Sequence, residues 1–166
     1  MSNYVVLLRG PPGVGKSTIA EKLIEVLPSP VVVIHKDVVQ FQFPYKGEIP
    51  VDKLILVMMR ALLRRKINVI IDGLYGGPDS AKRILRLKRT ARGLRSKFAV
   101  IVLDADKNTC LKRNKKRKKR IPRSDMHKWY DYFKKAKQNY LVVNTVGKSQ
   151  KQTFKEVLKL LKVSGI

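Results

Sequence analysis

Three kinds of feature are scarce in this sequence, and each scarcity excludes something. Cys110 is the one cysteine among 166 residues, so no intramolecular disulfide is possible. No apolar run approaches the roughly 18 residues that a membrane span requires, and the N-terminus carries no cationic leader followed by a cleavage site. We therefore expect a soluble, cytoplasmic protein without a membrane partner.

Acidic residues are the third scarce feature. The chain has 37 lysines and arginines against 12 aspartates and glutamates, which gives a net charge of +25 and an isoelectric point near 10.5. Such a charge attracts polyanions. A lysine-rich surface can instead reflect the growth conditions of the source organism, but thermophile surfaces normally add Glu as well, and Glu is scarce here. The composition therefore favours nucleic acid as a partner.

The length and the 44% hydrophobic content suit a single domain over residues 1–166. Helical patterns alternate with short apolar runs, which indicates an α/β layered fold with helices on both faces of a sheet. Ligands of open α/β sheets bind beyond the carboxyl ends of the strands, so the residues after each run are candidate site residues. The runs predict five buried, mainly parallel strands at residues 4–8, 31–34, 69–71, 98–103 and 140–143.

The stretch VVLLRGPPGVGKSTIA, residues 5–20, changes from an apolar run into a Gly/Pro-rich loop and then into a helical pattern. Four residues fit the phosphate-loop motif G-x-x-x-x-G-K-[ST]: Gly10, Gly15, Lys16 and Ser17. We expect the loop to bind ATP, with Lys16 at the β- and γ-phosphates and the Ser17 hydroxyl on Mg²⁺. The alternative is a glycine-rich turn with an incidental lysine. The predicted nucleotide-binding residues are Gly10, Gly13, Val14, Gly15, Lys16, Ser17 and Thr18.

Carboxylates follow two of the other predicted strands. Asp37 comes after a strand that we expect to neighbour the phosphate loop, and it is our candidate for the carboxylate that orients the attacking hydroxyl. Asp72 is a candidate for holding Mg²⁺ through water or for binding the acceptor hydroxyl. Both residues have a structural alternative, because Asp is also favoured at helix caps and turns. His35 is equally a base or a strand-end histidine with a satisfied hydrogen bond.

The densest cationic run, LKRNKKRKKRIPR, precedes the fifth predicted strand. Its position suits a lid over residues 112–123, whose arginines would stabilise charge on the transferring phosphoryl group and exclude water. Arg113 and Arg117 are four residues apart and would point the same way on a helix. The segment after the lid has aromatic residues among basic ones, and packing against the core explains them better than base stacking does: Trp129, Tyr130, Tyr132 and Phe133.

Together these features resemble the phage-type polynucleotide 5′-hydroxyl kinase domain and its small P-loop kinase relatives. The likeness covers most of the chain and is strongest at GPPGVGKST and at CLKRNKKRKKRIPRSDMHKWYDYF. It implies a sheet order of 2-3-1-4-5, Asp37 as general base, Asp72 in the acceptor or metal site, and Arg117 supported by Arg113 as lid arginines. One position departs from the pattern, because Gln40 stands where such kinases often carry an arginine that helps to hold the acceptor.

The leading hypothesis is an ATP-dependent kinase that phosphorylates a hydroxyl, in particular the 5′-hydroxyl of RNA or DNA. One alternative is a small-molecule kinase acting on a nucleoside, nucleotide, sugar or antibiotic hydroxyl. Another is a nucleic-acid-binding module controlled by a nucleotide. The polynucleotide hypothesis is stronger if the basic helix at residues 82–97 faces the acceptor pocket and forms one surface with the lid.

Overall fold

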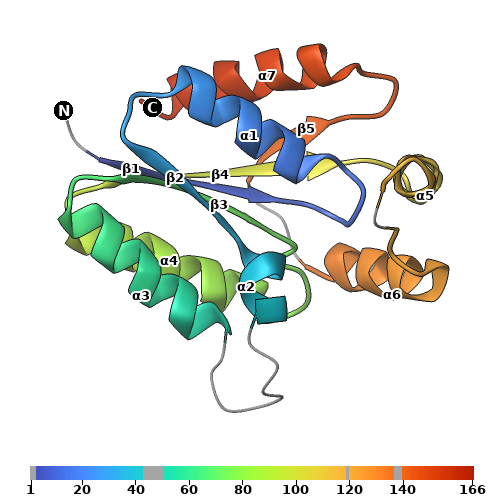
Figure 1. The fold of residues 1–166 in the computed structure, drawn as a ribbon, viewed down its shortest axis with the longest axis horizontal. Helices are drawn as coiled ribbons and strands as arrows, with labels where there is room; N and C mark the ends of the chain where they lie inside the picture. The colour runs from blue at the N-terminus through green and yellow to red at the C-terminus, as the bar shows by residue number, and fades with distance from the viewer. Residues whose placement is uncertain (1–2, 43–50, 119, 137–139) are drawn as a thin grey trace.

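The computed structural model describes residues 3–42, 51–118, 120–136 and 140–166. Five parallel strands form one sheet in the order β2-β3-β1-β4-β5, which confirms the predicted fold class and strand order (Figure 1). Their bounds lie within two residues of the predicted ones: β1 Tyr4–Arg9, β2 Val31–His35, β3 Asn68–Gly73, β4 Lys97–Asp104 and β5 Leu141–Asn144.

Helices cover both faces of the sheet, so the molecule has three layers (Figure 1). On one face lie α1 (Lys16–Val26) and α7 (Gln150–Val163), and on the other lie α3 (Val51–Arg64) and α4 (Ser80–Gly93). The remaining helices in the described ranges follow the carboxyl ends of strands or the lid segment: α2 (Lys36–Gln42), α5 (Lys107–Lys115) and α6 (Arg123–Lys134). None of the helices in the described ranges is long and apolar enough to cross a bilayer.

The alternation of side chains along β1 divides the core into two clusters. Val6 and Leu8 pack with α1 and α7, whereas Val5 and Leu7 pack with α3 and α4. A strand buried on both faces needs apolar residues at every position, which is why β1 and β3 read as continuous apolar runs. The edge strands β2 and β5 are only partly covered, so the prediction that all five strands are buried is wrong for these two.

Because all five strands are parallel, their carboxyl ends meet at one edge of the sheet. In the β2 to β3 ladder His35 lies opposite Asp72, and in the β1 to β3 ladder Arg9 lies opposite Gly73. The phosphate loop follows Arg9 directly. This edge therefore brings together the ends of the three strands that the sequence marks as candidate site positions.

Candidate active site

The phosphate loop is held closely between the sheet and α5. Gly13 has a φ of +80°, and a Cβ atom there would lie 2.7 Å from the carbonyl oxygen of Cys110. Gly15, with a φ of +108°, ends the loop and precedes α1. Glycine alone adopts these conformations readily, so the loop can bring its backbone N–H groups together at the positive end of α1.

Each residue of the predicted nucleotide site lies in this loop or in the first turn of α1. Lys16 is buried, and its Nζ donates a hydrogen bond to the Pro11 carbonyl at 3.1 Å, so the ammonium group curls back over the loop. The first turn of α1 contains no acidic residue that would oppose an anion. The Val14 side chain packs in the core, so only its backbone can face a phosphate. Of the other predicted residues, Gly10 is buried, Ser17 is exposed, and three are half-buried: Gly13, Gly15 and Thr18.

Ser17, Asp72 and His35 form one hydrogen-bonded group. The Ser17 hydroxyl donates to Asp72 Oδ2 at 2.7 Å, and His35 Nδ1 donates to the same oxygen at 3.0 Å. Burial by itself would raise the pKa of Asp72, but the His35 hydrogen bond, the Lys16 charge and the Ser17 hydroxyl hold this pKa below its ordinary value. The hydrogen bond to Asp72 in turn raises the pKa of His35. His35 is therefore a satisfied histidine that orients Asp72.

This group fits a magnesium ion. A serine hydroxyl and an ionised carboxylate are oxygen ligands of the kind that Mg²⁺ prefers, and Mg²⁺ bound in kinase sites takes its other ligands from water and substrate phosphates. In the described part of the chain, no cluster of three or more His, Cys, Asp or Glu side chains forms a ready metal cage. Ser17 and Asp72 can thus supply two protein oxygens beside the phosphate loop.

Asp37 lies at the same edge but farther from the loop than the sequence suggested. Since β2 pairs with β3, the strand β3 lies between β2 and β1, so the expectation that Asp37 follows a neighbour of the loop strand is wrong. Asp37 is exposed in the first turn of α2 and forms no hydrogen bond or ion pair with any residue that the structure describes. Its carboxylate is accessible to a ligand.

The residue before Asp37 is held firmly. Lys36 Nζ donates to Asp52 Oδ1 at 2.6 Å and lies 4.5 Å from the centre of the buried Tyr75 ring. Asp52 belongs to α3 and Tyr75 to the loop after β3, so two segments contact the start of α2. This network orients the turn that carries Asp37.

The two candidate lid arginines differ in their surroundings. Arg113 donates from Nη1 to the Val14 carbonyl at 3.1 Å and to Thr145 Oγ1 at 2.8 Å, and from Nη2 to the Thr145 carbonyl at 2.7 Å. Arg117 is exposed, and its side chain has no hydrogen bond or ion pair with a described residue. The expectation that both point the same way on one helix is wrong, because α5 ends at Lys115.

The carboxylates after β4 have structural partners. Asp104 forms an ion pair with Lys134 of α6 at 2.7 Å, and Asp106 accepts a hydrogen bond from the Thr109 backbone N–H at 2.8 Å as the N-cap of α5. The first contact attaches α6 to the end of β4, and the second begins α5. Neither carboxylate is left for the phosphate site.

Comparison with known proteins identifies the family of this chain. A family model described as an AAA domain matches residues 5–140 of this chain. The chain belongs to the AAA domain family. A nucleotide-binding phosphate loop agrees with this assignment.

Solved structures show that this AAA domain has the P-loop kinase fold. A sugar kinase from a Janibacter species is 16% identical with a TM-score of 0.70, covering 98% of this chain and 95% of that chain. A gluconokinase from Sinorhizobium meliloti is 15% identical with a TM-score of 0.71, covering 98% and 94%. A chain of the Pnkp1/Rnl/Hen1 RNA repair complex is 23% identical with a TM-score of 0.61, covering 80% of this chain and 44% of that chain. The specific likeness to the phage-type polynucleotide kinase stays a prediction.

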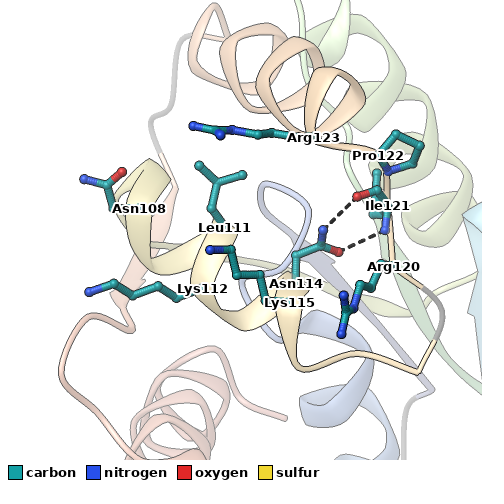
Figure 2. Close-up of a pocket in the computed structure, with 9 residues that line it drawn as sticks. All are labelled: Asn108, Leu111, Lys112, Asn114, Lys115, Arg120, Ile121, Pro122 and Arg123. Carbon is teal, nitrogen blue, oxygen red and sulfur yellow. Dashed lines mark hydrogen bonds between the residues drawn. The ribbon is translucent and has the colours of Figure 1, made fainter.

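The predicted lid contains a cationic cavity between α5 and the start of α6 (Figure 2). Its volume is about 610 Å³, and no carboxylate lines it. Asn114 closes the turn beneath it, since its side chain donates to the Ile121 carbonyl at 2.8 Å and accepts from the Ile121 N–H at 3.1 Å. Lys119 of the predicted lid lies outside the described residues. Nine residues line the cavity: Asn108, Leu111, Lys112, Asn114, Lys115, Arg120, Ile121, Pro122 and Arg123.

The basic helix at residues 82–97 only partly meets the condition set for the polynucleotide hypothesis. The start of α4 lies near the site, because the Arg83 guanidinium donates to the Gly76 carbonyl in the loop after β3. The end of α4 leads into β4 at the opposite edge of the sheet, where the Lys97 N–H bonds to the Asn3 carbonyl. The helix therefore runs from the loop after β3 toward the opposite edge of the sheet, and only its first turn lies near the site.

Sequence reasoning missed Arg9, the last residue of β1. It is fully buried, and its guanidinium lies 5.2 Å from the centre of the Phe133 ring and 5.5 Å from that of Tyr140. None of its three nitrogens has a hydrogen-bond partner among the described residues, and burial lowers its pKa. The signal was present, since an arginine ends an apolar run directly before Gly10.

The aromatic residues of α6 divide between core and surface. Phe133 is fully buried, and the half-buried Tyr130 donates its hydroxyl to the Ala105 carbonyl at 3.0 Å. Trp129 is exposed. The expected packing against the core is thus correct for Phe133 and wrong for Trp129.

Proposed function

We propose that this chain is an ATP-dependent kinase that transfers the γ-phosphate to a hydroxyl, with the 5′-hydroxyl of RNA or DNA as the favoured acceptor. The observation that carries the proposal is the contact between Ser17 and Asp72 at 2.7 Å, directly beside Lys16. A phosphate loop, a magnesium-binding pair of oxygens and an accessible carboxylate at one sheet edge are the parts that phosphoryl transfer requires.

Each proposed role follows from a contact or from its absence. Lys16 and the loop N–H groups hold the donor phosphates, while Ser17 and Asp72 hold Mg²⁺, which when bound neutralises phosphate charge. Asp37 accepts the proton of the attacking hydroxyl, since its carboxylate has no other partner among the described residues. Arg117 reaches the transferring phosphoryl group from the lid.

Arg113 receives a different role from Arg117. Its guanidinium is occupied by backbone and side-chain oxygens of Val14 and Thr145. It therefore supports the site by holding the phosphate loop against the segment that follows β5. This support is what places the backbone of the loop for the donor.

The charge of the chain favours a polyanionic acceptor. A net charge of +25 and a lid cavity lined by Lys112, Lys115, Arg120 and Arg123 suit a phosphate backbone. A small-molecule acceptor is the second candidate, because a sugar kinase and a gluconokinase share the fold over nearly the whole chain. The third candidate is a nucleotide-controlled nucleic-acid-binding module.

The test is transfer of label from γ-labelled ATP and Mg²⁺ to a panel of 5′-hydroxyl oligonucleotides, nucleosides, gluconate and other sugars. Label in oligonucleotides supports the proposal, label in a small acceptor favours the second candidate, and label released only as inorganic phosphate favours the third. Lys16→Ala should abolish transfer while the protein stays folded, and Lys159→Ala on α7 is the matched control.

The second test examines the proposed base. Asp37→Asn keeps the shape of the side chain but removes the negative oxygen that accepts the proton, so ATP affinity should persist while turnover falls by about two orders of magnitude or more. Equilibrium binding of ATP and single-turnover transfer measure the two effects separately. Loss of ATP binding with unchanged turnover would show that Asp37 acts on the metal or the fold instead.

A further inference from the structure

The single tryptophan of the chain lies partly exposed on α6. Trp129 keeps 38% of its surface exposed, although burial of a ring of this size is strongly favourable. Tyr132 contacts it edge to face, with ring centres 5.9 Å apart and planes at 88°. Lys128 Nζ lies over the Trp129 ring, 5.2 Å from its centre. A partly exposed indole with a tyrosine against it and a cation over its ring is a candidate stacking surface for a ligand.

Contacts of the neighbouring turn fix where this ring lies. The Gly77 N–H donates to the Tyr132 carbonyl at 2.9 Å, and a Cβ atom at Gly76 would lie 2.8 Å from the Phe133 Cα. At Gly77 a Cβ atom would overlap the Tyr132 ring. The two glycines therefore let α6 pack directly on the loop after β3.

That loop begins immediately after Asp72 and Gly73, so it leads from the proposed metal site to α6. Tyr132 contacts the loop, and Trp129 contacts Tyr132. The indole is thus connected through Tyr132 to the loop that follows Asp72, at the edge of the sheet where the carboxyl ends of the strands meet. A ligand bound at this edge can extend over it.

We propose that Trp129 stacks against a nucleobase of a single-stranded RNA or DNA acceptor, an inference that rests on the proposed kinase function. Aromatic side chains beside basic residues bind single strands because every base has a π face and every linkage carries a negative charge. Lys128 and the lid cations supply the charge, and Trp129 supplies the stacking surface. A sugar acceptor has no aromatic face to stack.

Because Trp129 is the one tryptophan, its fluorescence reports on this site alone. A 5′-hydroxyl oligonucleotide should quench the emission to saturation without ATP. Heparin, a polyanion without bases, and an oligonucleotide with abasic residues at its 5′ end should bind without comparable quenching. Anisotropy of labelled ligands measures binding independently. Oligonucleotide binding that leaves the emission unchanged overturns the proposal.

Two substitutions of Trp129 test how much the stacking ring contributes to oligonucleotide affinity. Trp129→Leu keeps an apolar side chain but removes the ring, so KM for the oligonucleotide should rise roughly ten- to hundred-fold. Trp129→Phe keeps an aromatic face and should restore most of the affinity. KM for ATP should be unchanged in both variants. An unchanged KM for the oligonucleotide in Trp129→Leu overturns the proposal.

These outcomes separate the stacking site from the kinase function. Quenching by oligonucleotides without phosphate transfer supports stacking and contradicts the proposed kinase activity. Transfer to oligonucleotides with a normal KM in Trp129→Leu contradicts stacking and leaves the kinase activity intact.

Discussion

Replacement of Arg113 by methionine tests whether this arginine supports the phosphate loop or acts on substrate. Its guanidinium makes three hydrogen bonds, one to the Val14 carbonyl and two to Thr145. Thr145 is 1% exposed, so water has little access to its oxygens once the arginine is removed. Arg113→Met keeps the apolar stem of the side chain but removes the donor from the Val14 carbonyl and from Thr145 Oγ1, while the Thr145 carbonyl keeps a longer hydrogen bond from the Lys148 N–H at 3.3 Å.

The expected loss of stability follows from these contacts. A hydrogen bond from a charged donor contributes about 1.5–3 kcal/mol net, and an unsatisfied buried acceptor costs a similar amount. Because Arg113 is half-buried and methionine retains part of the packing, we expect a total loss of about 2–4 kcal/mol. For a chain of this length that corresponds to a fall in Tm of about 5–12 °C.

Thermal unfolding followed by circular dichroism measures this change, and Arg117→Met is the matched control. Arg117 is exposed and has no side-chain partner in the described ranges, so its loss should change the stability by less than about 0.5 kcal/mol. Arg117→Met should instead reduce turnover, because it removes a charge proposed to act on the transferring phosphoryl group.

The result that refutes this reasoning is a wild-type Tm for Arg113→Met together with abolished turnover. Arg113 would then act on substrate, as the sequence pattern suggested, and its contacts with Val14 and Thr145 would not support the loop. Equal losses of stability in both variants would show that Arg117 also has a structural partner.

Two further predictions concern charge. Arg9→Met should raise the free energy of unfolding by about 1–2 kcal/mol, because burying an unpaired guanidinium costs more than its cation–π contacts contribute. Denaturant titration measures this change. A clear loss of stability would reveal an anionic partner for Arg9. Neutralising Lys112 and Lys115 together should reduce the salt dependence of oligonucleotide affinity by about 0.7 in logarithmic slope for each phosphate that the two lysines neutralise. The same change at Lys155 and Lys159 on α7 is the control, and an equal effect there would show that the lid cavity has no special role.

The sequence by itself determined the fold class and the phosphate loop. Hydrophobic runs without alternation indicate parallel strands covered on both faces, and β1 and β3 have this pattern. The loop is a local motif, since its glycines, Lys16 and Ser17 act within a few residues of one another. Asp72 was identifiable for a related reason, because any residue just after a central strand must lie at the ligand edge.

Only the tertiary structure decided which residues become partners across the sheet. The register of β2 against β3 places His35 opposite Asp72, where the two side chains share a hydrogen bond. Such pairings join residues about 37 positions apart, so no local pattern contains them. The same holds for Arg113, whose contacts with Val14 and Thr145 depend on how α5 packs against two distant loops.

The tertiary structure also decided whether side chains with both apolar and polar parts, such as arginine and tryptophan, are buried. Arg9 is enclosed because α6 and Tyr140 pack over the end of β1, whereas Trp129, on the same helix as Phe133, faces outward. Helical periodicity assigns residues to faces but does not show which face meets the core. The packing of α6 on Gly76 and Gly77 made that choice, because only glycine leaves room for the helix to approach the loop so closely.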